Sequence, residues 1–593
     1  MLFLRPVNLT GTQKTLQPME LLEKSRQRAQ QWLESPVIDQ DTKHTVSELL
    51  AATDSRELID RFYKDLEFGT GGLRGTMGVG PNCMNRYTVG IATQGLANYL
   101  KKSFPGQTIK VAIAYDSRNN SSSFARIVAD VFTANGIVVH LFPELRPTPL
   151  LSFAIRHLGC HSGVVITASH NPKEYNGYKA YWTDGAQLVP PHDGNVITEV
   201  NAITGYDQVK FNGNDTLLHH IGAEVEDAYY SEVLGLIPRQ DAISRQHNIS
   251  LVYSSLHGAG ITMVPECLRR LGFTNVHVVE AQRTPDGNFP TVQSPNPEER
   301  SAMAMALEEG KTHQADLIMA TDPDTDRVGI AIRNPEGEYL LLNGNQALSI
   351  MLWFILKNHH PGALPPYLAK TIVTTELIDS MAAHFGVECV NTLTGFKYIA
   401  ELIRTNEGKK SFIAAGEESY GYMVGPFVRD KDAVSSCAFF AALAAAARDV
   451  GQTMYDWMLQ VYKDHGFYKE GLINLVRKGA EGEREIRAMM ERLRMNPPQE
   501  IGGSAVVRIL DYKAGIEQQV DKEVTRPLSF PTSDVLQFYT ADGSKISVRP
   551  SGTEPKIKFY ISVHSSLPAI ASFEAVSRLL DDRIAAISAS LGN

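Results

Sequence analysis

The sequence predicts an α/β protein with three α/β domains followed by a smaller C-terminal α+β domain. Three observations lead to this fold class. A strand–helix–strand arrangement occurs three times along the chain, the last part of the chain has a different pattern, and 593 residues are enough for about four domains. Strands that alternate with helices are typical of parallel sheets with helices on both faces.

Each repeat contains an apolar strand, a helix that ends at a glycine, and a second, β-branched strand. Glycine often follows the last turn of a helix, and Gly136, Gly272 and Gly386 occupy this place in the three repeats. The predicted strand, helix and strand lie at 110–115, 123–135 and 137–142, then at 249–253, 264–271 and 276–280, and finally at 370–373, 378–385 and 387–390.

The two ends of the chain differ from the repeats. Residues 1–50 are polar with a helical pattern, which predicts a helical extension packed on the first domain. Near the C-terminus, predicted strands at 545–549 and 556–563 meet at a tight turn, with helices predicted at 484–495 and 568–587. We expect an extension at 1–50, α/β domains at 51–225, 226–342 and 343–468, and an α+β domain at 469–593.

The composition argues against several classes of function. A net charge of -9 provides no overall basic field for nucleic acid or a membrane surface. The apolar runs 347–356 and 437–447 are shorter than the roughly 18 residues of a membrane helix. Five distant cysteines without a CxxC pair are typical of thiols in a reducing compartment. We expect a cytoplasmic protein that binds neither nucleic acid nor membranes.

The segment TDPDTDR, residues 321–327, places three carboxylates at alternate positions after a strand-like run. On a straight strand they would face one side and repel one another, and a hard divalent cation such as Mg²⁺ removes that cost. An EF-hand is excluded, because Arg327 and Arg333 stand where that loop needs Gly and Glu. The alternative is a solvated acidic turn.

Three other segments carry groups that bind anions or sugars. GTGGLRG, residues 69–75, could form an anion-binding nest beside Arg74 or a plain flexible turn. RPSGT, residues 549–553, has the donors for a dianionic phosphate but also fits a hairpin turn. GEESYG, residues 416–421, suits a sugar diol or the acidic first turn of a helix.

Ser169 lies in TASHNPKEYNGYK, residues 167–179, after a strand-like run. It is outside any Gly-x-Ser-x-Gly elbow, so the sequence gives no support for a hydrolase triad. His170 is more often a turn residue than a base for its neighbour, and most lysines such as Lys179 are solvated. A serine that accepts and returns a phosphoryl group would unite the metal motif with the two phosphate motifs.

Taken together, the segments at 69–75, 167–179, 321–327, 416–421 and 549–555 resemble the α-D-phosphohexomutase family, in particular its phosphoglucomutase branch. The similarity runs in order from about residue 50 to residue 565. It implies three related α/β/α domains with mixed sheets and a smaller C-terminal α+β domain around a central cleft. Within the family, the longer N-terminus resembles a large branch of bacterial phosphoglucomutases and eukaryotic phosphopentomutase-like enzymes.

The resemblance also implies roles for individual residues. Ser169 would carry the phosphoryl group and, with Asp322, Asp324 and Asp326, hold Mg²⁺. The candidate catalytic residues are Ser169, His170, Arg74 and Lys179, of which Lys179 is the candidate general base. The candidate substrate-binding residues are Arg327, Lys397, Glu417, Ser419, Arg549, Ser551, Gly552 and Thr553.

The implied reaction interconverts glucose 1-phosphate and glucose 6-phosphate through a phosphoserine and glucose 1,6-bisphosphate. The Glu-Glu-Ser of residues 417–419 resembles glucose-acting members. A phosphopentomutase, a phosphomannomutase, a phosphatase and a silent sugar-phosphate binder are the alternatives. The expected partners are small sugar phosphates, and the expected state is a monomer or weak homo-oligomer.

Overall fold

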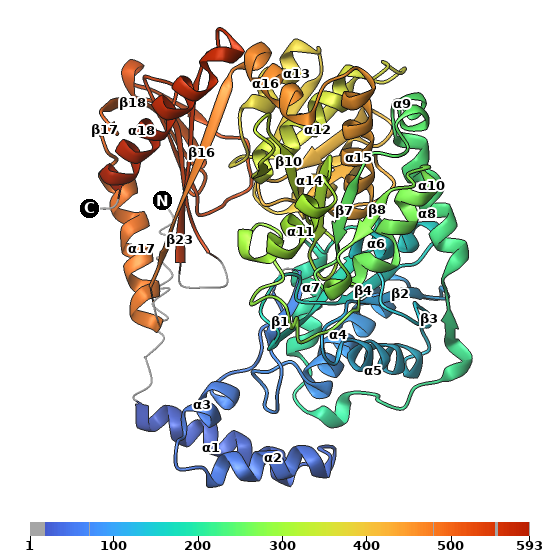
Figure 1. The fold of residues 1–593 in the computed structure, drawn as a ribbon. Helices are drawn as coiled ribbons and strands as arrows, with labels where there is room; N and C mark the ends of the chain where they lie inside the picture. Colours follow the sequence, from blue (N-terminus) through green and yellow to red (C-terminus); the bar gives the residue numbers. More distant parts are fainter. Residues whose placement is uncertain (1–17, 70, 478, 552–555, 592–593) are drawn as a thin grey trace.

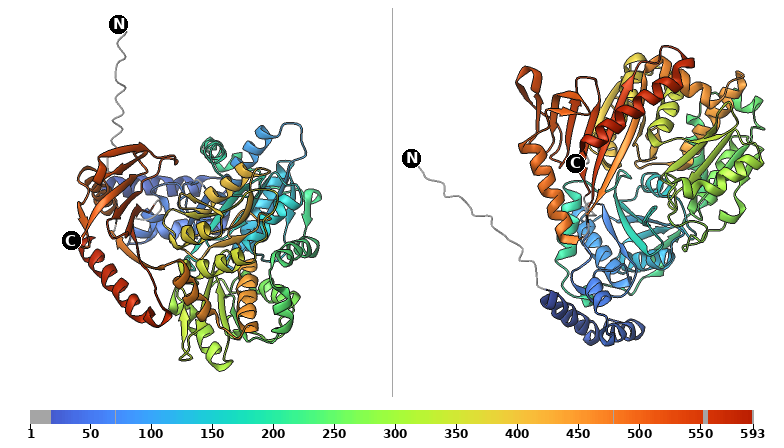
Figure 2. Two further views of the ribbon diagram at one scale, coloured as in Figure 1. Left: turned by 90° about the horizontal axis from the view of Figure 1, so that it is seen from above. Right: turned by 60° about the vertical axis from the view of Figure 1, so that its left-hand side comes forward.

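Four sheets follow one another along the chain, each with its own helices (Figure 1). The computed structural model describes residues 18–69, 71–477, 479–551 and 556–591. Three sheets with their helices form the larger part of the molecule, and the fourth stands beside the third domain (Figures 1 and 2). This is the predicted fold class of three α/β/α domains with mixed sheets and a C-terminal α+β domain.

The described part of the N-terminal extension is helical, as predicted, and packs on the first domain. It consists of α1 (Pro18–Glu34) and α2 (Gln40–Ala51), followed by α3 (Arg56–Phe62). Trp32 of α1 makes edge-on contacts with Phe62 of α3 and with Tyr87 of α4 (Arg86–Ser103), at centroid distances of 5.6 and 5.4 Å. The Tyr87 hydroxyl also donates to Asp39, the N-cap of α2, at 2.6 Å.

The first sheet has the strand order β1-β5-β4-β2-β3-β6. Its centre is parallel, whereas β5 runs antiparallel to β4 and to β1. The strands are β1 (Gly72–Thr76), β2 (Lys110–Tyr115), β3 (Val138–Leu141), β4 (Ser162–Ile166), β5 (Tyr175–Trp182) and β6 (Leu218–His220). The helices are α4, α5 (Ser121–Ala134), α6 (Thr148–His157) and α7 (His192–Asn201).

The glycine-rich segment is part of this sheet, so the prediction of an open nest or a flexible turn was wrong for residues 72–75. They belong to β1, which pairs with β5 so that Gly72 faces Lys179. Gly72 has φ +131°, and a Cβ there would lie 1.7 Å from the carbonyl oxygen of Tyr178. Glycine is required at this position because the two backbones approach so closely.

The second and third sheets have the orders β11-β10-β9-β7-β8 and β13-β12-β14-β15. The strands of the predicted repeats pair in parallel, β7 with β8 and β12 with β13, and antiparallel strands complete each sheet. The second has β7 (Leu251–Ser254), β8 (Val276–Val278), β9 (Leu317–Thr321), β10 (Val328–Arg333), β11 (Tyr339–Leu341), α8 (Ala223–Leu236), α9 (Gln240–Arg245), α10 (Val264–Arg270) and α11 (Arg300–Thr312).

The third domain carries the most helices of the four. It has β12 (Pro366–Thr371), β13 (Glu388–Thr392), β14 (Ser411–Gly416), β15 (Tyr422–Val424), α12 (Gly344–Lys357), α13 (Leu377–His384), α14 (Phe396–Asn406), α15 (Ala433–Asp449) and α16 (Met454–His465). Within the described residues no single helix is long and apolar enough to cross a membrane, and α15 with α16 pass only as a pair bent by 91°. Residues 433–447 of α15 are all buried, which makes it a core helix.

The C-terminal sheet is antiparallel, with the order β16-β23-β22-β21-β18-β19-β20 and β17 paired to β18. It has β16 (Phe467–Val476), β17 (Glu500–Ile501), β18 (Ser504–Asp511), β19 (Ile516–Gln519), β20 (Val524–Pro527), β21 (Leu536–Thr540), β22 (Lys545–Pro550), β23 (Lys556–Ser565), α17 (Gly479–Met495) and α18 (Phe573–Leu591). The last helix begins five residues later than predicted, because residues 570–572 form a 3₁₀ turn.

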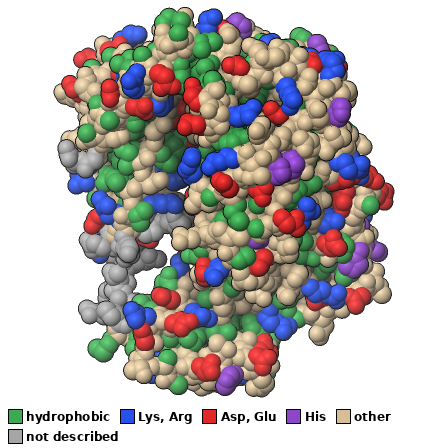
Figure 3. Space-filling model, in the orientation of Figure 1, with side chains coloured by type: hydrophobic (Ala, Val, Ile, Leu, Met, Phe, Trp, Pro, Cys, Tyr) green, Lys and Arg blue, Asp and Glu red, His purple; other side chains and the backbone are tan. Residues whose placement is uncertain are grey.

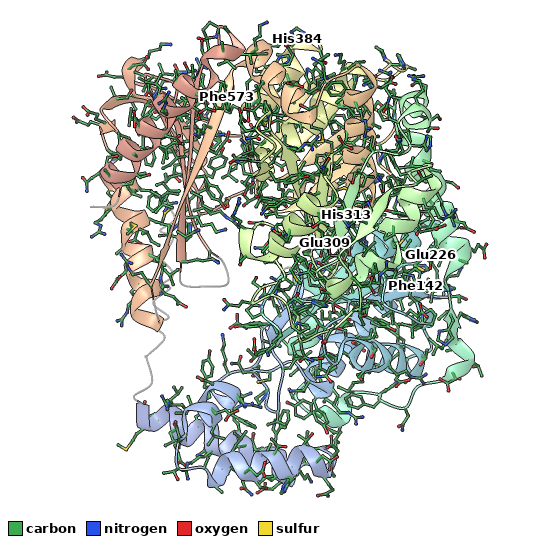
Figure 4. The ribbon with its side chains drawn as sticks, in the orientation of Figure 1. Phe142, Glu226, Glu309, His313, His384 and Phe573 are labelled. Carbon is green, nitrogen blue, oxygen red and sulfur yellow. The ribbon has the colours of Figure 1, made fainter. Side chains whose placement is uncertain are left out.

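The C-terminal domain is anchored on the third domain by aromatic and polar contacts. Phe573 of α18, labelled in Figure 4, stacks on Phe467 and on Tyr462 of α16 at centroid distances of 5.0 and 6.3 Å. The Lys545 ammonium donates to the carbonyl oxygens of Ile372 and Thr374 at 3.3 and 3.2 Å. These contacts join the two domains through buried and partly buried side chains.

Candidate active site

Ser169 lies just beyond β4, in a tight loop with left-handed backbone geometry. Its φ is +52°, and its side chain is almost fully buried. The Ser169 amide donates to Thr167 Oγ1 at 2.8 Å, and that hydroxyl donates to Asp116 Oδ2 at 2.6 Å. The serine is thus held in an uncommon backbone conformation at the end of a parallel strand, where functional side chains often lie.

Arg118, which the sequence analysis did not single out, fixes the rest of this loop. Its guanidinium donates to the carbonyl oxygen of Ser169 at 2.6 Å and to that of Asn171. It also donates to the carbonyls of Pro172 and Tyr175, both at 2.9 Å. One buried fork therefore binds four backbone carbonyls around the serine, a geometry that the single ammonium of a lysine does not reproduce.

The three aspartates of residues 321–327 converge in a turn after β9. One carboxylate oxygen from each aspartate lies within 4.8 Å of the other two, and all three residues are buried. The chain turns because Thr325 has φ +58° and Asp322 accepts from the amides of Asp326 and Arg327 at 3.1 and 3.0 Å. The acidic group is therefore a compact loop rather than a straight strand, and its burial excludes the solvated acidic turn.

This acidic loop meets the serine loop directly. Ser169 Oγ donates to Asp322 Oδ2 at 2.8 Å. Among the described residues, Asp324 Oδ1 and Asp326 Oδ1 are buried without a hydrogen-bond partner. Buried carboxylate oxygens without partners are costly, and hard cations such as Mg²⁺ prefer oxygen ligands. The donor set fits a divalent cation.

The pKa values of Asp322 and Asp326 shift in opposite directions. Burial, followed by the neighbouring Asp324 and Asp326, raises the pKa of Asp322 well above its usual range. Burial also opposes ionisation of Asp326, but the Lys179 and Lys431 ammonium groups hold its pKa well below the usual value. Two carboxylates with opposite shifts in one cluster are typical of a functional site.

Two buried lysines form ion pairs with carboxylates of the acidic loop. Lys179 Nζ donates to Asp324 Oδ2 at 2.7 Å and to Asp326 Oδ2 at 3.1 Å. Lys431, which the sequence analysis did not name, lies 3.2 Å from Asp326 and 2.9 Å from Asp430. Burial lowers the pKa of each lysine, but the adjacent carboxylates outweigh it and raise the pKa overall. The site contains two ammonium groups beside its metal ligands.

Three further predicted residues surround the serine. His170 Nδ1 lies 3.1 Å from Ser169 Oγ, and burial, followed by the charge of Arg327, lowers its pKa well below the usual value. Its imidazole is therefore neutral. Arg74 donates to Asn171 at 3.4 Å, and Arg327 donates to Glu298 at 2.7 Å and to the Ser419 carbonyl at 2.9 Å. Arg327 thereby links the acidic loop to the predicted sugar loop.

The sugar loop follows β14, as predicted, and its two glutamates differ. Glu417 is buried and accepts from the amide of Gly395 at 2.9 Å, two residues before Lys397. Glu418 accepts from Thr371 and Thr374, both at 3.2 Å, so it holds the backbone of its own domain. Lys397 lies in the first turn of α14 with its ammonium over the Tyr398 ring, and burial lowers its pKa.

The predicted phosphate loop lies at the end of β22 in the C-terminal domain. Arg549 pairs across the strands with Lys558 of β23, and the Ser551 amide donates to the Lys556 carbonyl at 2.8 Å. Gly552 and Thr553 lie outside the described residues. The molecule is hollowed between this domain and the first domain, with Lys and Arg side chains around the hollow (Figure 3).

The structure therefore brings Ser169, His170, Lys179, Arg327 and the aspartates into one cluster. Arg74 lies at its edge through Asn171. Glu417 is connected to the cluster through the backbone of its own loop, where the Ser419 carbonyl accepts from Arg327. Arg549 and Ser551 lie in the separate C-terminal domain, in and just after β22.

Comparison with known proteins indicates a single protein family. The models of phosphoglucomutase/phosphomannomutase α/β/α domains I, II and III match residues 65–207, 227–337 and 343–465, and the model of the C-terminal domain matches residues 481–576. A phosphoglucomutase of Staphylococcus haemolyticus is 36% identical over 522 residues, which are 87% of this chain and 93% of the relative. A phosphoglucomutase of Staphylococcus aureus is 39% identical over 508 residues, 85% of this chain and 90% of the relative.

Two solved structures share the fold. A putative phosphomannomutase from Thermus thermophilus has a TM-score of 0.65 at 21% identity, over 87% of this chain and 99% of its own. The phosphoglucomutase parafusin from Paramecium, in an open form, has a TM-score of 0.65 at 18% identity, over 90% of this chain and 96% of its own. With all four domains matched in order and relatives above 30% identity, this chain belongs to the phosphoglucomutase/phosphomannomutase family.

Proposed function

We propose that this protein is a phosphoglucomutase that interconverts glucose 1-phosphate and glucose 6-phosphate through a phosphoserine at Ser169. The observation that carries the proposal is the meeting of the two loops, in which Ser169 Oγ lies 2.8 Å from Asp322 within a buried acidic cluster. A nucleophilic hydroxyl beside cation ligands and fixed cationic side chains is the arrangement that phosphoryl transfer needs.

In the proposed reaction, phosphorylated Ser169 gives its phosphoryl group to the free hydroxyl of a sugar monophosphate. The bond from phosphorus to Ser169 Oγ breaks as a bond to the sugar oxygen forms, and the hydroxyl proton passes to a base. Glucose 1,6-bisphosphate then turns round, and Ser169 takes the other phosphoryl group. Lys179 is the candidate base, and Asp324 and Asp326 hold its Nζ in place. Because these carboxylates also raise the pKa of Lys179, its ammonium must lose a proton before the neutral amine can accept the one from the sugar hydroxyl.

Asp322, Asp324, Asp326 and the phosphorylated Ser169 would hold Mg²⁺, which neutralises charge on the transferring phosphoryl oxygens. Arg74, which donates to Asn171 of the serine loop, and Arg327, which donates to the Ser419 carbonyl, would bind the same phosphoryl group. Glu417 and Ser419 would bind sugar hydroxyls, with Lys397 beside them. Arg549, Ser551, Gly552 and Thr553 would bind the phosphate that is not transferred.

Glucose is favoured over pentose and mannose phosphates, because both bacterial relatives described above are named phosphoglucomutase. A ³¹P NMR assay with Mg²⁺ and a trace of glucose 1,6-bisphosphate, on glucose, mannose and ribose 1-phosphates in separate samples, tests this assignment. We expect glucose 1-phosphate to be converted fastest. Fastest turnover of ribose 1-phosphate would indicate a phosphopentomutase, and free phosphate alone would indicate a phosphatase.

The bisphosphate must turn round without being lost or hydrolysed, so we also propose that the C-terminal domain closes over the cleft. Closure would bring Arg549 towards the bound sugar phosphate, because Arg549 lies on the C-terminal domain whereas Ser169 lies on the first domain. Limited trypsin digestion with and without glucose 1,6-bisphosphate provides the test. Protection by the bisphosphate is expected, and an unchanged digestion pattern would count against closure.

A further inference from the structure

A second cavity, of about 550 Å³, lies apart from the acidic cluster. Neither Ser169 nor any of the three aspartates lines it. Its walls come from three parts of the chain. Arg156 lies near the end of α6, and Leu236 and Pro238 lie at and just after the end of α8. Strands β14 and β15 of the third domain, with their neighbours, form the rest. Its volume is within the range of small-molecule sites, which often lie between domains.

Most of the cavity wall is apolar. The main contributors are Leu236, Ile355, Tyr367, Ile403, Phe412 and Phe439. Leu236 and Leu364 are 36% and 39% exposed, so the apolar wall reaches the surface. A sugar phosphate is a poor match, because such a wall leaves most of its hydroxyl groups without hydrogen-bond partners.

Two arginines, Arg156 and Arg429, are part of the cavity wall. Arg429 donates to the carbonyl of Val428 at 3.1 Å and to Glu407 at 2.5 Å, and Arg156 lies 3.6 Å from the same carboxylate. Two guanidinium groups thus share one glutamate, whose side chain is 58% exposed. Lys410 adds a third cation to the wall, although it pairs with Glu388 at 2.5 Å.

Arg429 is the more deeply buried of the two arginines, and it also donates to the carbonyl of Pro426. Its side chain is 1% exposed, and its Nε is buried without a hydrogen-bond partner among the described residues. Burial, followed by the charge of Arg156, lowers the pKa of Arg429 to about 10. A buried cation that shares its carboxylate with a second arginine is stabilised by a further anion placed beside it.

Both arginines are connected to the acidic loop. Helix α6, which ends near Arg156, begins at Thr148, whose amide and hydroxyl donate to the carbonyl and carboxylate of Asp324 at 2.9 and 3.1 Å. Arg429 is two residues from Lys431, which lies 3.2 Å from Asp326. The Arg429 amide also donates to Ser152 of α6 at 2.8 Å, so the two connections are joined.

We propose that this cavity binds a small organic anion with an apolar body, and that the bound anion acts on the metal-ligand loop. The carboxylate or phosphate of the ligand lies against Arg156 and Arg429, and its apolar body lies along Tyr367, Phe412 and their neighbours. A movement of α6 or of residues 429–431 changes the position of Asp324 or Asp326. The site is therefore an effector site distinct from the one that carries Ser169.

Isothermal titration of the full chain with octanoate, and with octan-1-ol as its neutral counterpart, tests the binding. Arg156→Met removes the more exposed arginine without emptying the core, and Leu364→Trp narrows the mouth of the cavity. Arg283→Met is the control, because the ion pair of Arg283 with Glu280 lies at the surface. We expect octanoate to bind the unaltered chain and the control equally, and octan-1-ol more weakly. Arg156→Met should raise the Kd for octanoate about tenfold, which is the effect of losing one charged hydrogen bond.

Leu364→Trp should weaken the binding of octanoate and of octan-1-ol to the same extent, because it changes the apolar wall that both ligands would contact. Equal octanoate affinity in all four chains, or no binding up to its solubility limit, would overturn the site. The action on the loop is tested by Mn²⁺ affinity, measured by electron paramagnetic resonance with and without octanoate. At one octanoate concentration near the Kd of the unaltered chain, we expect the Mn²⁺ affinity of that chain to change at least about twofold and that of Arg156→Met to change much less, because the coupled effect follows the fraction of chain that has bound octanoate. An unchanged Mn²⁺ affinity would overturn the coupling.

Discussion

Replacement of Arg118 by lysine tests whether the serine loop must be held by a guanidinium fork. Arg118 donates to the carbonyls of Ser169, Asn171, Pro172 and Tyr175. A lysine ammonium keeps the charge, but it reaches only part of this set from a single nitrogen. If two of the four bonds are lost, at about 1.5–3 kcal/mol for each bond to a charged group, the loop loses about 3–6 kcal/mol of local stabilisation.

The expected consequence is a misplaced serine rather than an unfolded protein. A displacement of about 1 Å at a reacting atom can lower a rate about 10²-fold, so kcat for glucose 1-phosphate should fall by about that factor. KM should change much less, because the sugar and phosphate loops lie elsewhere. The assay is steady-state kinetics of glucose 6-phosphate formation, with the circular dichroism spectrum recorded for both chains.

The matched control is Arg126→Lys, which alters a surface guanidinium that pairs with Asp130 and Asp215 at 2.9 and 2.7 Å. Surface pairs contribute little, so this variant should keep the kcat of the unaltered chain. A folded Arg118→Lys variant with kcat within about threefold of the unaltered chain would refute the reasoning, because the fork would then have no part in positioning Ser169.

Three further predictions concern the acidic loop and the domain junction. Asp324→Asn should raise the Mg²⁺ concentration needed for half-maximal rate by about tenfold or more, and an unchanged Mg²⁺ titration would contradict the metal assignment. Lys431→Met leaves Asp326 and Asp430 without one buried cation, so kcat should fall at least about tenfold at pH 7, whereas an equal rate would exclude a role for this lysine. Burial raises the pKa of Glu470 from 4.5 to about 7, so the folded protein keeps a proton that the unfolded chain loses, and this contribution to stability declines as the pH rises from about 4.5 to 7. Glu470→Gln should therefore gain stability relative to the unaltered chain over that interval, on the order of 3 kcal/mol at most, and parallel melting temperatures from pH 5 to 8 would contradict this.

The repeated architecture was predictable because it has strong local signals. Each predicted strand at 110–115, 249–253 and 370–373 overlaps β2, β7 or β12, and each glycine after a helix has the positive φ that ends helices. The antiparallel strands were harder to predict. Two of the five residues of β1 are glycine, and its pairing with β5 depends on a close backbone approach that only the folded chain shows.

The candidate site likewise contains some residues that the sequence indicated and others that it did not. Ser169 and the aspartates follow strands and form recognisable patterns, so the sequence alone identified them. Arg118 and Lys431 were missed, because each acts through residues far away in the chain. The charged run Arg429-Asp430-Lys431-Asp432 directly before α15 was a visible signal, since four charged residues at the start of a buried helix need partners.

Several expectations stay predictions. The domain boundaries at residues 50, 225, 342 and 468, the cytoplasmic location and the monomeric or weakly oligomeric state are among them. So are the roles of individual site residues, including the Lys179 base and the phosphate loop at 549–553.

The central claim is that Ser169 carries the phosphoryl group and returns it to the sugar. The most direct measurement treats the protein with glucose 1,6-bisphosphate, locates the phosphate by peptide mass spectrometry, and then adds glucose 1-phosphate in excess. We predict phosphate on Ser169, its loss on addition of the sugar phosphate with formation of glucose 1,6-bisphosphate, and neither event in Ser169→Ala. A Ser169→Ala variant that still converts glucose 1-phosphate to glucose 6-phosphate, or a phosphoserine that releases only free phosphate, would contradict the account.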